Sequence, residues 1–172
     1  MAKIPTALRE LMTTFPHAGK VEWIGVRPAP RVAMLSLSSV QAVAGRGLAR
    51  DRTAEKSRPG NNRQVTLIQA EHLESVGKLL RRGAIDSALT RHNIVVSGIN
   101  LLALKNHSFR IGGAVLELTG DCQPCSLMEL QLGAGGYNAM RGHGGMTAIV
   151  LESGLIEVGA AVTPLVLSEA VE

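Results

Sequence analysis

This chain has little cysteine, few aromatic residues and no long hydrophobic run. Its 172 residues include two cysteines and four aromatic side chains, so the core must be built from Val, Leu, Ile and Ala. Two cysteines are too few for a disulfide framework, and no apolar run approaches the roughly 20 residues needed to cross a bilayer. No positively charged segment followed by an apolar stretch opens the sequence. We therefore expect a disulfide-free cytoplasmic protein that has no membrane partner.

Positive charge is concentrated in one window of the chain. The formal net charge is only +4 at pH 7, which is too small to indicate a nucleic-acid partner. Residues 45–63 nevertheless contain Arg46, Arg50, Arg52, Lys56, Arg58 and Arg63 against only Asp51 and Glu55. This window is either a solvated loop or an anion-binding loop, in which glycines admit a ligand and guanidinium groups bind its oxygens. The sequence has no G-x-x-x-x-G-K-[ST] motif, which excludes a Walker-type phosphate loop.

Two further segments offer candidate ligand-binding side chains. The segment "RHN" contributes Arg91 and Asn93, and "MRGHGGM" contributes Arg141 and His143. The glycines of the second segment favour a tightly turning, exposed backbone. Each histidine is alternatively an ordinary surface residue.

The hydrophobic periodicity indicates a mainly β domain with a few helices. An amphipathic helix is expected before Lys20, with Pro5 in its first turn. After it, short β-branched or alternating runs bounded by Gly, Ser and Pro are typical of strands; these are "VEWIGV", "VAMLSLSSV", "NIVVSG", "FRIGGAVLELTG" and "TAIVLESGLIEVGAAVTPLVL". Helical spacing predicts one helix within 67–84 and a second short one over 85–91. Because the strands do not alternate regularly with helices, we expect one α+β domain built on a small barrel.

Both cysteines lie in one loop, within the stretch "ELTGDCQPCSLMEL". Asp121, Gln123 and Pro124 favour an exposed turn around Cys122 and Cys125. A thioredoxin-like pair would open a helix in a βαβ unit, and a zinc site would need two more ligands at metal spacing; neither pattern is visible. The remaining interpretations are one nucleophilic or sulfur-carrying thiolate and a pair of inert small hydrophobes. Helical character in "SLMEL" would place backbone amides beside Cys125, which favours Cys125 as the reactive thiolate.

The order of these motifs resembles the MOSC domain family, which is related to the C-terminal part of molybdenum cofactor sulfurases. The segments "GRGLARDR", "NNRQVTLIQAEHL", "RHNIVVSGINLLAL", "FRIGGAVLELTGDCQPC" and "AMRGHGGMTAIVLESGLIEVGAAV" follow one another between about Lys20 and Val162. The resemblance implies a MOSC-like β-barrel domain over residues 20–168, preceded by an N-terminal helical extension over residues 1–19.

The resemblance also implies a site. Cys125 matches the family cysteine that is thought to ligate molybdenum or to carry sulfur, with Cys122 as its accessory. The basic pocket for the pterin phosphate of the molybdenum cofactor would comprise Arg52, Arg63, Arg91, Asn93, Arg141 and His143. We expect Arg52, Arg63 and Arg141 to converge on one pocket with the cysteine loop.

Three functions stay open at this point. The leading one is a domain that binds the molybdenum cofactor or transfers sulfur, with a cysteine desulfurase as the implied donor. The second is a molybdenum-dependent reductase of N-hydroxylated compounds, which would need an electron-transfer partner protein, and the third is a non-catalytic anion-binding module. The family also carries an association with pyridoxal phosphate. Two positions depart from its pattern, because Arg50 replaces a glycine beside Asp51 and Ala160 stands where an aspartate is common.

Overall fold

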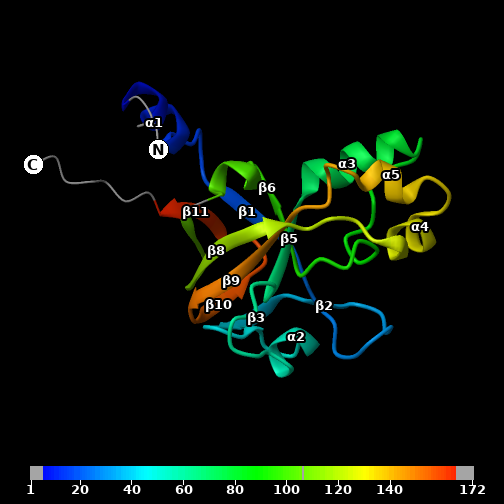
Figure 1. Cartoon of the computed structure of the whole chain (residues 1–172), viewed down its shortest axis with the longest axis horizontal. Coiled ribbons are helices and arrows are strands. Elements are labelled where there is room, and N and C mark those ends of the chain that lie inside the picture. The colour runs from blue at the N-terminus through cyan, green and yellow to red at the C-terminus, as the bar shows by residue number, and fades with distance from the viewer. Residues whose placement is uncertain (1–5, 106, 166–172) are drawn as a thin grey trace, which may run out of the picture.

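The computed structural model describes residues 6–105 and 107–165 (Figure 1). The strands are β1 (Gly19–Val26), β2 (Leu35–Leu37), β3 (Ser39–Val43), β4 (Gly47–Leu48), β5 (Val65–Gln69), β6 (Ile94–Ser97), β7 (Ser108–Ile111), β8 (Ala114–Asp121), β9 (Met146–Glu152), β10 (Gly154–Glu157) and β11 (Ala161–Leu165). The helices are α1 (Thr6–Thr13), α2 (Arg52–Glu55), α3 (Ala70–Leu79), α4 (Ser126–Leu132), α5 (Gly136–Met140) and the 3₁₀ helix η1 (Leu101–Leu104).

Seven of these strands close into a barrel. Their order is β11-β7-β8-β9-β5-β6-β1, and the ring closes because β1 also pairs with β11. The β5–β6 pair is parallel, and the other neighbouring pairs in the ring are antiparallel. Strand β2 extends the sheet beyond β1, while β10, β3 and β4 form a separate three-stranded sheet. The mainly β, barrel-like fold expected from the sequence is confirmed.

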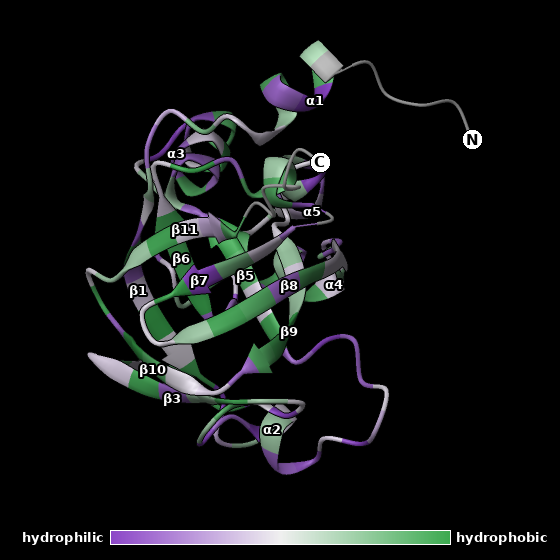
Figure 2. Cartoon of the chain, turned by 90° about the vertical axis from the view of Figure 1, so that its left-hand side faces the viewer, coloured by the Kyte–Doolittle hydropathy of each residue, from purple (hydrophilic) through white to green (hydrophobic). Residues whose placement is uncertain are grey.

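Aliphatic side chains fill the barrel, and Figure 2 shows hydrophobic residues along its strands. Phe109 is the one fully buried aromatic residue in the described part of the chain. Because successive strand residues point to opposite faces, Leu67 of β5 faces the barrel core while Ile68 joins a second, smaller apolar cluster. That cluster also contains Val76 of α3 and Met128 of α4. Burial on both faces of β5 therefore packs the helices against the outside of the barrel, beside the cysteine loop.

The helices agree in part with the sequence-based expectation. Helix α1 lies within the expected N-terminal segment, whereas Pro5 falls outside the described residues, as does the end of the expected domain at 166–168. Helix α3 is confirmed but begins only at Ala70, because the residues before it form β5, which runs into the helix without a breaking residue.

The short helix predicted over 85–91 is wrong. The Asp86 side chain accepts a hydrogen bond from the Ala88 N–H at 2.8 Å, and the Asp86 carbonyl accepts one from the Leu89 N–H at 3.1 Å. Local side-chain bonding of this kind competes with helix formation. Arg91 then adopts φ = 60°, a left-handed conformation that ends the turn. No helix in the described residues is long and apolar enough to span a membrane.

Candidate functional site

The cysteine loop, residues 122–125, joins the end of β8 to the start of α4. Cys125 is the N-cap residue of α4, which confirms the helix expected in "SLMEL". The loop packs on the glycine-rich segment that precedes β9, where the Cys122 N–H donates to the Gly145 carbonyl at 2.9 Å. A Cβ atom at Gly144 would overlap the carbonyl oxygen of Cys122. Only glycine therefore allows the two segments to lie this close.

A cavity of about 220 Å³ opens beside this loop, and we name it the arginine pocket. Its polar and charged lining comes from segments far apart in sequence: Arg27, Arg63, Thr66, Thr90, Arg91, His92, Cys122, Gln123 and Cys125, with Pro124, Leu127, Met128, Met140 and Gly144 completing the wall. Three guanidinium groups and both thiols thus line one cavity. This combination favours an anionic ligand that also meets sulfur.

The two cysteines differ in exposure, and the protein raises the pKa of Cys122. Cys122 is partly buried, whereas Cys125 is exposed. Burial raises the pKa of the Cys122 thiol, although Arg63 and Arg27 act in the opposite direction. The Nη2 atom of Arg63 lies 3.9 Å from the Cys122 Sγ. Cys122 is therefore held mainly as the thiol at neutral pH, and Cys125 is the sulfur that solvent or a partner reaches.

Arg27 is fixed in the pocket wall by a buried carboxylate. The Asp51 side chain is fully buried and accepts from the Arg27 N–H at 2.9 Å, the Arg27 Nε at 3.2 Å and the Thr53 N–H at 2.8 Å. Burial by itself raises the pKa of Asp51, but the hydrogen bond and charge of Arg27 outweigh it, so the pKa lies below its ordinary value. An ionised Asp51 therefore orients the Arg27 guanidinium in the wall of the pocket.

Asn93 supports this network from behind the pocket and does not line it. Its Nδ2 donates to Asp51 at 2.9 Å and to the Gly25 carbonyl at 3.1 Å, while its Oδ1 accepts from the Thr66 N–H at 3.1 Å. Because these bonds engage the amide on both sides, Asn93 holds Arg27 and Asp51 in place. The sequence suggested Asn93 as a cofactor-binding residue, whereas in the structure its side chain contacts Asp51 and Arg27.

Arg91 adds positive charge to the pocket and forms no ion pair with another described residue. Its Nη1 donates to the Val32 carbonyl at 2.9 Å. Burial lowers its pKa, and the nearby charges of Arg27 and Arg52 lower it further, against an opposing effect of Asp51. Cations held near one another in this way gain stability when an anion binds between them.

Of the three arginines expected to converge, only Arg63 lines the pocket. Arg52 is the first residue of α2 and acts on Arg91 through its charge without lining the cavity. Arg141 is exposed at the C-cap of α5. His143 packs edge-on against His72, with 5.0 Å between ring centroids, and lines neither cavity beside the cysteine loop.

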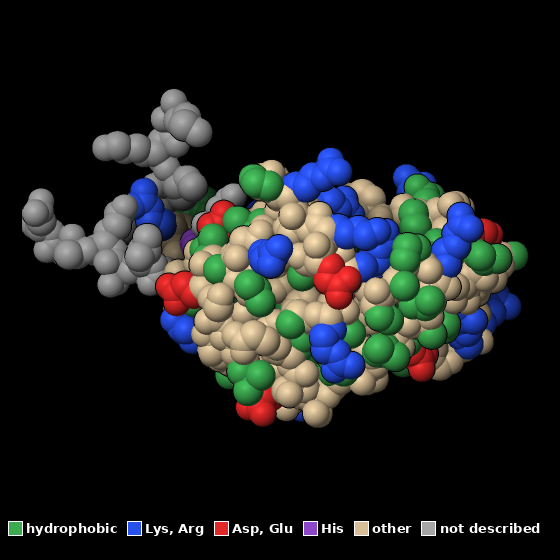
Figure 3. Space-filling view, turned by 90° about the horizontal axis from the view of Figure 1, so that it is seen from below, with side chains coloured by type: hydrophobic (Ala, Val, Ile, Leu, Met, Phe, Trp, Pro, Cys, Tyr) green, Lys and Arg blue, Asp and Glu red, His purple; other side chains and the backbone are tan. Residues whose placement is uncertain are grey.

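The basic window itself forms a turn with β4 and α2 rather than a wall of the pocket. Seen from below, several Lys and Arg side chains lie next to one another on the face of the molecule that carries α2 (Figure 3). Arg63, the last residue of the basic window, is the one that contacts the cysteine loop. Most of the window is therefore a solvated surface, which was one of the two sequence-based interpretations.

Sequence reasoning missed Arg27 and His92 as pocket residues. Arg27 follows a strand without a neighbouring charge cluster or glycine motif, so no signal singled it out. His92 is buried, its Nε2 lies 2.7 Å from the Gly144 carbonyl, and its Nδ1 has no hydrogen-bond partner among the described residues. Burial lowers the pKa of His92 to about 4, so the ring is neutral and Nε2 donates to Gly144.

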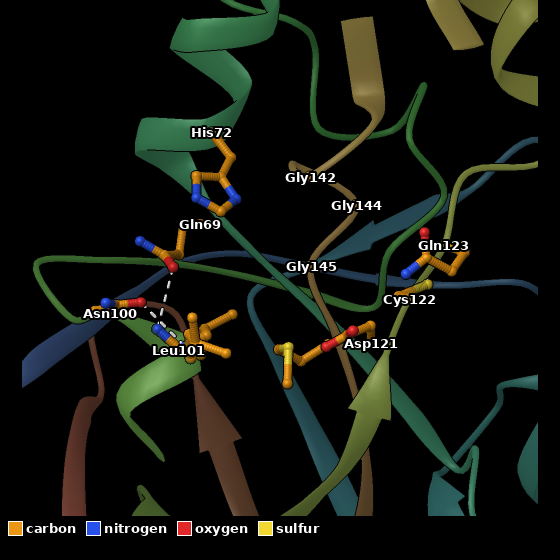
Figure 4. Close-up of a pocket in the computed structure, with 12 residues that line it drawn as sticks. Gln69, His72, Asn100, Leu101, Asp121, Cys122, Gln123, Gly142, Gly144 and Gly145 are labelled. Atoms are coloured by element: carbon orange, nitrogen blue, oxygen red, sulfur yellow. Dashed lines mark hydrogen bonds between the residues drawn. The ribbon is translucent and has the colours of Figure 1, made fainter. Parts of the chain in front are cut away.

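A second cavity, of about 410 Å³, lies on the other side of the cysteine loop, and we name it the histidine pocket (Figure 4). It shares Cys122, Gln123 and Gly144 with the arginine pocket. In the described part of the chain, no three or more His, Cys, Asp or Glu side chains form a group that could hold a metal ion.

The chain matches the model of a known family. The family model described as MOSC domain matches residues 54–163, which is more than half of the chain. No curated protein matches the chain.

Solved structures share the barrel fold at low sequence identity. The YuaD protein from Bacillus subtilis is 18% identical with a TM-score of 0.71, over 85% of this chain and 94% of that one. YiiM from Geobacillus stearothermophilus is 16% identical with a TM-score of 0.69, over 88% and 77% of the two chains. YiiM from Escherichia coli is 16% identical with a TM-score of 0.66, over 91% and 73%. The family match and these structures give no support for pyridoxal phosphate binding.

Proposed function

Since the chain belongs to the MOSC domain family, we propose that its arginine pocket binds the molybdenum cofactor, with the Cys125 thiolate as the protein ligand to the metal. The observation that carries this proposal is the meeting of an exposed thiol with three guanidinium groups in one cavity. Molybdenum favours soft thiolate ligands, and guanidinium groups match the oxygens of a phosphate.

The donor set fits the cofactor better than a bare metal ion. The described residues offer one accessible thiol but no cluster of three metal ligands. The molybdenum cofactor brings sulfur ligands of its own and needs few from the protein, and when bound it supplies a centre for two-electron chemistry. Arg63 and Arg91 would bind the phosphate, and Arg27, oriented by Asp51, would add a third cation.

Cys122 would serve this site without binding the metal. Its partly buried thiol is kept protonated by burial, so it competes weakly with Cys125 for a soft metal. Its backbone fixes the loop on Gly145. His92, which donates to Gly144, would hold the glycine-rich segment against the same loop.

A sulfur-carrier role is the second candidate, and the exposure of Cys125 favours it. The Cys125 thiolate would attack the outer sulfur of a persulfide on a donor such as a cysteine desulfurase. The sulfur–sulfur bond of the donor breaks, the donor cysteine leaves as a thiolate, and Cys125 keeps the persulfide. Reduction of N-hydroxylated compounds would use the same pocket together with an electron-transfer protein, and cofactor binding is its first requirement.

The test is the cofactor content of protein purified from cells that make the cofactor. We expect molybdenum and pterin to copurify in near-equal amounts with the wild-type protein and with Cys122→Ser, and to be lost from Cys125→Ser. Arg63→Ala and Arg91→Ala should each weaken retention by about 1.5 to 3 kcal/mol, the range for hydrogen bonds to charged groups. Arg46→Ala is the matched control, because Arg46 is exposed and lies outside the pocket.

Two results would contradict the proposal. One is wild-type protein from such cells that carries no molybdenum or pterin but carries labile sulfur on Cys125, which would favour the carrier role. The other is equal cofactor content in Cys125→Ser and wild type, which would remove the thiolate from the metal site.

A further inference from the structure

A further cavity, of about 440 Å³, lies between helix α1 and the 3₁₀ helix η1, and we name it the α1 groove. Residues between 11 and 17 form one wall, and residues between 98 and 107 form the other. Helix α1 lies at the end of the molecule opposite to α4 (Figure 1). The groove shares Asn100 and Leu102 with the histidine pocket but no residue with the arginine pocket. It is therefore separate from the site proposed for the cofactor.

The walls of the α1 groove are largely apolar and exposed to solvent. Leu11 of α1 is 72% exposed, Met12 is 52% exposed, and Leu102 of η1 is 60% exposed. All three line the cavity, together with Phe15 and Ile99. A single exposed apolar side chain is ordinary on a protein surface, whereas several that face one hollow are stabilised when an apolar group covers them. The groove therefore favours a ligand with a hydrocarbon part.

The polar lining of the groove favours an anion. Lys105 is exposed and forms no ion pair with another described residue. His17 and His107 also line the cavity, and an imidazole carries a ring N–H donor in either protonation state. No Asp or Glu lines the groove within the described part of the chain. The Glu71 carboxylate lies outside the lining, where it accepts from the Gly98 N–H at 2.7 Å.

We infer that the α1 groove binds a medium-chain aliphatic carboxylate, with the hydrocarbon chain between α1 and η1 and the carboxylate at Lys105. Charge-assisted hydrogen bonds from an ammonium group or an imidazole would hold the head group. An amine with the same chain would meet Lys105 without a compensating negative charge. The cavity volume of about 440 Å³ lies within the range of small-molecule sites. This ligand differs from the cofactor, and its binding does not depend on the proposed function.

The first test compares carboxylates of different length with an amine. Hexanoate, octanoate, decanoate and octylamine are each titrated into the ¹⁵N-labelled full chain, and amide shifts are followed by NMR. We expect octanoate to shift the amides of Leu11, Met12, Ile99, Leu102 and Lys105. Affinity should rise about two- to fourfold for each added CH₂ group, where fourfold corresponds to complete burial of that group. Octylamine should bind at least about tenfold more weakly than octanoate.

The second test removes the cation. Lys105→Gln should weaken octanoate binding about threefold to fivefold, the upper part of the range for exposed ion pairs, and should not weaken the binding of octylamine. Lys78→Gln is the matched control, because it removes the same charge from an exposed position on α3 outside the groove. Both substitutions are at exposed positions, so the fold should tolerate them.

Four results would overturn the inference. One is octylamine binding as tightly as octanoate, and another is an equal loss of octanoate affinity in Lys105→Gln and Lys78→Gln. The third is the absence of shifts at these amides up to 10 mM octanoate. The fourth is a shift of the same amides with protein concentration alone, which would assign the groove to a second copy of the chain.

Discussion

Replacing Asp51 with Asn is expected to destabilise the folded chain strongly. The carboxylate is fully buried and its two oxygens accept different donors. Oδ2 accepts from the Arg27 N–H, the Arg27 Nε and the Asn93 Nδ2, and Oδ1 accepts from the Thr53 N–H and the Arg27 Nη2. An amide keeps the shape but turns one of these acceptors into a donor.

The magnitude follows from that geometry. The amide can place its NH₂ at the Oδ1 position at best, where it would face the Thr53 N–H and the Arg27 guanidinium. Each buried group left without a partner costs about 1 to 3 kcal/mol, and breaking a buried ion pair costs about 3 to 5 kcal/mol. We therefore expect Asp51→Asn to lose about 3 to 5 kcal/mol of unfolding free energy. For a chain of this size, that corresponds to roughly 10 °C in Tm.

The assay is urea denaturation at pH 7, with Glu55→Gln as the control. Glu55 is exposed in the adjoining α2, so its replacement should change stability by less than about 0.5 kcal/mol. The folded-state pKa of Asp51 is lowered, so its contribution is present above the ordinary pKa of about 4 and is lost as the pH falls through the folded pKa. Wild type and Asp51→Asn should converge in stability on acidification. A loss below 1 kcal/mol at pH 7, or an equal loss in Glu55→Gln, would refute the reasoning.

Three further experiments test the contacts around the cysteine loop. Gly144→Ala forces the loop away from the glycine-rich segment and should lower the unfolding free energy by about 1 to 3 kcal/mol. Gly60→Ala is the control, because Gly60 lies in open space at φ = 81° and its replacement should cost only the strain of a left-handed backbone. Iodoacetamide at pH 7 should label Cys125 before Cys122, because Cys122 is partly buried and its pKa is raised; mass mapping that finds Cys122 labelled first would reverse their roles. The folded chain keeps His92 neutral down to about pH 4, whereas the unfolded chain protonates it near pH 6.5. The free energy of unfolding should therefore decrease by about 3 kcal/mol as the pH is lowered from 6.5 to 4. His92→Gln should flatten that part of the pH–stability curve, and an unchanged slope would contradict the pKa.

The sequence predicted the parts of the fold that local patterns control. Runs such as "NIVVSG" and "FRIGGAVLELTG" alternate or are β-branched, so β6, β7 and β8 lie where expected. The strand β5 was missed because "VTLIQ" continues directly into α3, and the helix expected over 85–91 failed because the Asp86 side chain bonds the backbone locally. In both cases a short apolar or polar run was compatible with two structures.

What the sequence by itself determined about this protein is a disulfide-free, aliphatic-core β domain with one cysteine loop and a surplus of arginine. It also placed Cys125 at the start of a helix, because that depends on neighbouring residues only. Which arginines meet the cysteines was decided by the tertiary structure, since barrel closure brings Arg27 and Arg91 to Cys122 while α5 ends with Arg141 exposed. Asp51 and Asn93 are buried behind that pocket, and His92 is kept neutral in its wall. Both features depend on contacts between residues that are distant in the chain, so no local sequence pattern could predict them.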